Sequence, residues 1–134
     1  MFEHFIDAQE PVYATALHEL EAGRKQSHWM WFIFPQIAGL GFSSMSQCFA
    51  LGSLAEAQSY LSHPVLGERL RECTSAVLKH PHRSAYAILG SPDDMKFHSS
   101  MTLFSRAAPE EPLFREALET FFDGEEDAAT LARL

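Results

Sequence analysis

The chain has 134 residues, of which 46% are hydrophobic and 21% charged, and this composition is typical of a single soluble globular domain. Its formal net charge is −8 and its pI is near 5.2. Such an acidic chain lacks the broad basic face that non-specific binding to nucleic acid or to an anionic membrane requires, so we expect neither partner.

The beginning of the sequence, MFEHFIDAQE, is acidic and lacks the charged-then-apolar pattern of a signal peptide. No apolar run has the length of a membrane span, and we expect a cytoplasmic protein. Cys48 and Cys73 form no CxxC pattern, which favours two reduced, mostly buried thiols over a disulfide or zinc site. His80-Pro-His82 has no third ligand at a diagnostic spacing and predicts a loop with solvated histidines. We therefore expect no metal and no cofactor.

The first predicted element is helical, because apolar residues recur every three or four positions from Phe2 to Leu20. Gly23 has the position of a helix terminator, and Pro11 indicates either a helix start or a kink. The segment 29–34 is apolar at every position, so it fits either a buried helical turn or an extended run. It should end at Phe34, since a proline follows.

The remaining elements are predicted from their boundaries. Ser53-Leu-Ala-Glu56 is a capping box that opens a helix, and His63-Pro64 starts another that ends before Pro81. Ser91-Pro-Asp-Asp94 combines a capping serine, a first-turn proline and two acids, and predicts a helix to about Ala107. An amphipathic helix over 113–122 and a short turn capped by Asp127 complete the chain. We predict one compact all-α domain over residues 1–134, with six or seven helices and short loops.

Four blocks of the sequence resemble domain-of-unknown-function family 1810: RKQSHWMWFIFPQIAGLGFSSMSQ, EAQSYLSHPVLGERLREC, LGSPDDMKFHSSMTLF and DGEEDAATLARL. The resemblance spans about residues 5–134 and implies a mainly α-helical, intracellular bacterial-type protein with no established activity. Some members carry the label "calpastatin". That label does not fit this chain, because calpain inhibitors of that kind are disordered, whereas this sequence has the composition of a packed domain.

The first candidate site is the aromatic stretch SHWMWFIFPQ with its polar ends. Trp29 and Trp31 could stack on a planar ligand, Lys25 could bind an anion, and His28 titrates near neutral pH. The following glycines and serines (39–44) could donate hydrogen bonds to an anion, although they lack the P-loop spacing. The alternative is that the rings are core and their polar neighbours are satisfied locally.

The second candidate site is DDMKFHSSM. On a helix, Asp93, Lys96 and Ser100 share one face, and His98 points to a different side. Lys96 would contact an anion, with Ser99 or Ser100 as hydrogen-bond donors. The alternative is a surface Asp93–Lys96 pair, worth a few tenths of a kcal/mol, beside a helix cap.

We therefore predict binding of a small, planar, anionic, nucleotide-like metabolite in a pocket formed by the two stretches. The alternative is a non-enzymatic protein-interaction module with an exposed aromatic groove. Local spacing leaves open whether the stretches meet, whether the protein is an enzyme, and its oligomeric state. For an enzyme, the candidate general bases are His28 and Asp94. The predicted ligand-binding residues are Lys25, His28, Trp29, Trp31, Gln36, Asp93, Lys96, Ser99 and Ser100.

Overall fold

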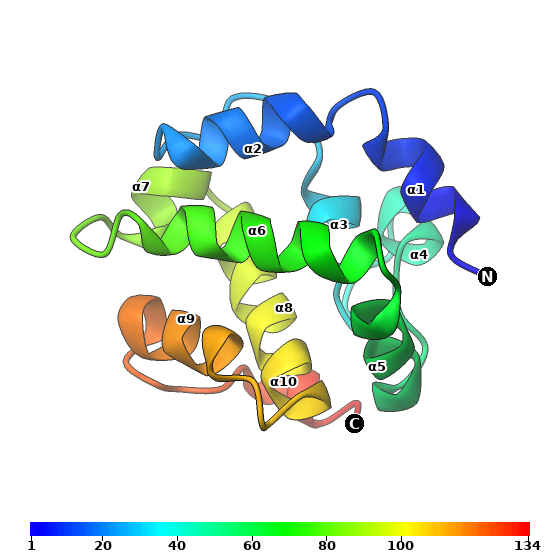
Figure 1. Ribbon diagram of the computed structural model, residues 1–134. Coiled ribbons are helices and arrows are strands. Elements are labelled where there is room, and N and C mark those ends of the chain that lie inside the picture. The colour runs from blue at the N-terminus through cyan, green and yellow to red at the C-terminus, as the bar shows by residue number, and fades with distance from the viewer.

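The computed structural model describes all 134 residues, and its regular elements are all helical (Figure 1). The ten helices are α1 (Glu3–Gln9), α2 (Tyr13–Glu21), α3 (Met30–Ile33), α4 (Ser44–Cys48), α5 (Leu54–Ser62), α6 (Leu66–Leu78), α7 (Ala85–Leu89), α8 (Asp93–Ala107), α9 (Pro112–Phe122) and α10 (Ala128–Leu131). The strand-like contact is one isolated parallel bridge between Ile37 and Leu51. The all-α class is confirmed, whereas the predicted number of six or seven helices is too low.

The difference in number has two causes. The first predicted helix is two helices, because the chain breaks around Pro11 between α1 and α2. The short helices α4 and α7 have five residues each, too few for an apolar period to be visible in the sequence. The apolar segment 29–34 forms the short helix α3, and its last residue, Phe34, has a non-helical backbone as expected before a proline.

Several predicted caps are confirmed. The Ser53 hydroxyl accepts a hydrogen bond from the Glu56 amide at 3.1 Å, and Asp127 Oδ2 accepts one from the Thr130 amide at 3.1 Å. The serine before α8 does not cap it: the N-cap position is Pro92, and no side chain binds there. The end of α8 at Ala107 agrees with the prediction.

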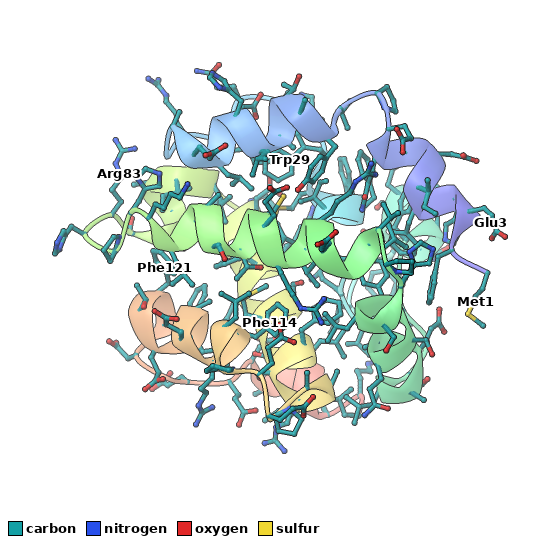
Figure 2. The ribbon with its side chains drawn as sticks, in the orientation of Figure 1. Met1, Glu3, Trp29, Arg83, Phe114 and Phe121 are labelled. Atoms are coloured by element: carbon teal, nitrogen blue, oxygen red, sulfur yellow. The ribbon has the colours of Figure 1, made fainter.

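Helix α8 is the centre of the fold and packs against α5, α7, α9 and α10. Helix α6 crosses the middle of the view, with α2 beside it above and α9 below (Figure 1). The interior is rich in rings, and Phe97 of α8 contacts Phe34 with a centroid separation of 5.0 Å. Trp29 and Phe114 point into this core, whereas Met1 and Glu3 lie at the periphery (Figure 2).

None of the ten helices combines the length and hydropathy needed to cross a membrane. The longest helix, α8, has 15 residues.

The two cysteines have different environments. Cys73 lies in α6 without exposed surface, and its burial raises the pKa of the thiol to about 12. Cys48 is the last residue of α4 and is exposed. The expectation of two mostly buried thiols is therefore wrong for Cys48, because α4 is a surface helix with no buried residue.

We expect iodoacetamide to alkylate Cys48 in the native protein at pH 8 and to leave Cys73 unmodified, because the thiolate is the reactive form. Mass spectrometry should show one adduct, and a second should form only in denaturant. Cys48→Ser should give no native adduct. A native adduct on Cys73 formed as fast as that on Cys48 would contradict the buried environment of α6.

Candidate functional site

The two sequence stretches meet in a buried ion pair. Lys25 Nζ lies 2.9 Å from Asp93 Oδ2, and only 8% of the lysine side chain is exposed. The Lys25 backbone amide also donates to the carbonyl of Ile88 at 2.8 Å. The segment after α2 is thus attached to the segment that leads into α8.

A second lysine approaches the same carboxylate. Lys96 Nζ lies 3.6 Å from Asp93 Oδ1 and 4.8 Å from the ring centroid of Trp31. Lys25 Nζ lies in the same way over Trp29, at 4.9 Å. We call these three charged residues the Lys25–Asp93–Lys96 cluster. With two ammonium groups and one carboxylate, it carries a net charge of +1.

Glu19 of α2 holds the segment that follows Lys25. Its carboxylate accepts hydrogen bonds from the amides of Gln26 and Ser27, from the Ser27 hydroxyl and from Trp29 Nε1, at 2.6–3.1 Å. Burial alone would raise the pKa of Glu19, but these donors outweigh burial and lower it. The buried carboxylate is therefore ionised and fixes Trp29 in the core.

Two adjoining hollows open beside Lys96. The first has a volume of about 280 Å³ and lies between the loop after α3, the first half of α8, and α10. The second has a volume of about 150 Å³ and lies along the same loop, between Gln36 and Ala50. Both are lined by Gln36, Leu40, Gly41 and Ser46, and we call them together the cleft. The other residues that line the first hollow are Pro92, Met95, Lys96, His98, Ser99, Asp127 and Ala129.

The charged groups of the cleft differ in their availability. Asp127 Oδ2 already accepts hydrogen bonds from Ser99 Oγ at 3.0 Å and from Thr130 Oγ1 at 2.6 Å. His98 stacks on a phenylalanine of α9 and donates from Nε2 to the carbonyl of Glu125 at 2.7 Å. Lys96 is the one lysine or arginine among the lining residues. Lys96 is therefore the charged group of the cleft that is available to a negatively charged ligand.

Residues 39–41 line the cleft, and the backbone amides from Gly39 to Phe42 are unpaired. None of these four amides donates a hydrogen bond within the protein. Gly39 has φ +98°, a left-handed conformation that other residues rarely adopt. Unpaired amides in a loop that lines a hollow are suitable donors for an anion.

The cleft contains only part of the predicted site. Gln36, Lys96 and Ser99 line it, whereas Lys25 and Asp93 form the ion pair behind it. Trp31 is partly buried beneath Lys96.

The other predicted residues lie elsewhere. Trp29 is 1% exposed, so its ring faces are covered by the core, and Ser100 is buried with a hydroxyl that has no hydrogen-bond partner. His28 is exposed and makes no hydrogen bond, and Asp94 accepts one from the adjacent Met95 amide. Neither candidate base lines the cleft.

For two of the residues that line the cleft, the sequence predicts a different position. His98 was expected on a different side of its helix from Lys96, and Asp127 only as a helix cap. Both line the cleft because the chain after α9 returns along α8 and builds an additional wall. The capping pattern at Asp127 showed where α10 begins, but no local signal showed where it packs.

The fold and the cleft define a small all-helical domain with a single lysine at a polar surface hollow. The chain belongs to DUF1810, a family of proteins of unknown function, and the match covers residues 1–134. It is similar to the conserved hypothetical protein Rv1873 from Mycobacterium tuberculosis, with 48% identity over 99% of this chain and 95% of that chain. The crystal structure of that protein superimposes with a TM-score of 0.97. No curated protein is significantly similar to the chain.

We expect Glu19→Gln to lower the free energy of unfolding by about 2 kcal/mol at pH 7, because an amide replaces an ionised acceptor of four hydrogen bonds. Folding lowers the pKa of Glu19 from its ordinary 4.5, so its stabilisation is complete above that pH. The stabilisation is lost as the pH falls through the lowered value. Urea unfolding between pH 3 and 7 should therefore show the difference shrinking in acid.

The matched control is Glu21→Gln, which removes an exposed carboxylate 3.1 Å from Lys79. It should change the stability by less than about 0.5 kcal/mol. Equal effects of the two variants at pH 7 would contradict the assigned role of Glu19.

Proposed function

We propose that the protein binds a small, planar, anionic metabolite of nucleotide-like type in the cleft. The observation that carries the proposal is the Lys25–Asp93–Lys96 cluster, in which two lysines share one carboxylate. Lys25 is buried in its ion pair, so the uncompensated positive charge is presented by Lys96, which lines the first hollow. An anion placed there would complete the charge balance of the cluster.

The distribution of acidic residues supports an anionic ligand. The chain contains 18 Asp and Glu residues, yet none lies in 22–55 and none in 73–92. The first of these acid-free segments contributes both tryptophans and the loop from Gln36 to Ala50 that lines the cleft. The loop itself therefore contributes no carboxylate to the cleft, where Asp127 is the one acidic lining residue.

The dimensions of the cleft favour a small ligand. Its larger hollow, at about 280 Å³, lies near the lower end of the roughly 300–1,000 Å³ usual for ligand pockets. In the proposed pose, Lys96 and Gln36 contact the anionic group. The planar part occupies the second hollow, among Ile37, Leu40 and neighbouring small residues. Trp29 is not part of this pose, because its ring is buried.

The proposal concerns binding and assigns no reaction. His28 and Asp94 lie outside the cleft, and the carboxylate of Asp127 is committed to capping α10. No group in the cleft is therefore assigned as a general base.

We expect adenosine 5′-monophosphate to raise the melting temperature of the wild-type protein, and adenosine to leave it unchanged. Lys96→Gln should weaken binding at least about tenfold in isothermal titration calorimetry, because it removes a charge-assisted hydrogen bond. The control Lys79→Gln removes an exposed lysine outside the cleft and should bind as the wild type. The proposal is rejected if neither adenosine monophosphate nor inorganic phosphate binds, or if Lys96→Gln binds them unchanged.

A second candidate function, a protein-interaction module, is favoured by the apolar side chains beside the cleft. Phe42 is 87% exposed and directly follows Gly41, and Met95 of the first hollow is 65% exposed. Large apolar side chains at the surface are typical anchor points for peptide segments.

For this candidate we expect peptides selected from a display library against the wild-type protein to bind Phe42→Ser at least about tenfold more weakly. The control Tyr86→Ser removes another exposed ring, 64% exposed on α7, and should retain the peptides. If the selection yields no peptide, or if the two variants bind equally, the exposed ring is not a docking site.

A further inference from the structure

Arg133 is a cation just beyond α10. It is neither among the predicted site residues nor among the residues that line the cleft. Its guanidinium lies directly over Gly39: a Cβ added there would be 2.6 Å from Nη1 and 2.7 Å from Cζ. Arg133 is exposed, and its only hydrogen bond is from its backbone amide to the Thr130 carbonyl. No carboxylate pairs with it, in a protein that has 18 acidic residues and 10 lysines and arginines.

The position of Arg133 is set by the wall of the cleft. The Asp127 amide donates to Thr102 Oγ1 at 2.9 Å, and Ser99 Oγ donates to Asp127 Oδ2 at 3.0 Å. These bonds attach α10 to α8 on one side of the first hollow. The chain beyond α10 then reaches Gly39, a lining residue of the second hollow, and the Arg133 guanidinium lies over that glycine.

Three kinds of donor thus lie at or beside the cleft: the ammonium of Lys96 in its lining, the guanidinium of Arg133 over Gly39, and the unpaired amides of residues 39–42. A carboxylate carries one charge on two oxygens and would leave several of these donors unused. A phosphate monoester carries a charge of about −1.5 to −2 at neutral pH on three oxygens. A guanidinium also matches phosphate with two parallel hydrogen bonds.

We infer that Arg133 is the second cation of the site and that the ligand is a phosphate monoester. The inference rests on the proposed function, because it assigns the chemistry of the same cleft. The phosphate lies between Lys96 and Arg133 and accepts from the amides of the glycine loop. The sequence allows this contact because Gly39 has no side chain: an alanine there would displace the guanidinium as well as adopt an unfavourable φ of +98°.

The test compares adenosine 5′-monophosphate with 3′,5′-cyclic adenosine monophosphate, which has the same base and sugar but a phosphodiester with one charge. By calorimetry at pH 7.5, the wild-type protein should bind the monoester at least about tenfold more tightly. Arg133→Gln should weaken binding of the monoester at least tenfold and change that of the diester little. The control Arg115→Gln removes an exposed arginine of α9 that forms no ion pair and should leave both affinities unchanged.

Each outcome separates this inference from the proposed function. If the monoester binds, Lys96→Gln loses it and Arg133→Gln binds as the wild type, Arg133 is not part of the site and only the further inference falls. Equal affinity of the wild-type protein for the monoester and the diester also overturns the further inference alone. If the wild-type protein binds neither nucleotide nor inorganic phosphate, both proposals fall. Arg133 is exposed, so circular dichroism should show that its variant remains folded.

Discussion

The buried ion pair between Lys25 and Asp93 is the interaction on which the arrangement of the site depends. It joins the segment after α2 to the first turn of α8, two parts of the chain that are far apart in the sequence. Loss of Asp93 would leave the Lys25 ammonium, whose side chain is only 8% exposed, without its carboxylate, which is destabilising. Because Asp93 also lies near Lys96, the pair that stabilises this junction places the lysine of the cleft over Trp31.

Two carboxylates from outside the acid-free segment 22–55 hold its beginning in place. Glu19 of α2 binds the amides and the indole of residues 26–29, and Asp93 of α8 binds Lys25. The Glu19 carboxylate acts on donors that would otherwise be unpaired in the interior, where an unsatisfied donor is costly. The aromatic stretch therefore supports the cleft from the core and contributes little to its lining. Its rings fill the core, and its last residue, Gln36, lines the hollow.

Interactions between near neighbours in the chain were predictable, and those between distant segments were not. The caps at Ser53 and Asp127 and the end of α8 at Ala107 depend on a few adjacent residues, and all are present. Helix α7 has five residues, too few to show an apolar period in the sequence. The exposure of Cys48 depends on how its short helix packs, which the sequence pattern does not show. Of the ligand-binding residues predicted in DDMKFHSSM, Lys96 and Ser99 line the cleft, and His98 lines it as well because α10 folds back along α8.

The unequal distribution of acids has a consequence for how an anion would approach the protein. At physiological ionic strength the Debye length is about 8 Å, shorter than the roughly 14 Å radius of gyration expected for a chain of this size. Carboxylates on remote surfaces are therefore largely screened, and an anion near residues 36–42 interacts mainly with the charges at the cleft, which are Lys96, Arg133 and Asp127. In dilute buffer the net charge of −8 acts over a longer range and repels the same anion. Moderate salt should therefore accelerate encounter at the cleft, in contrast to the behaviour of a uniformly basic binding protein.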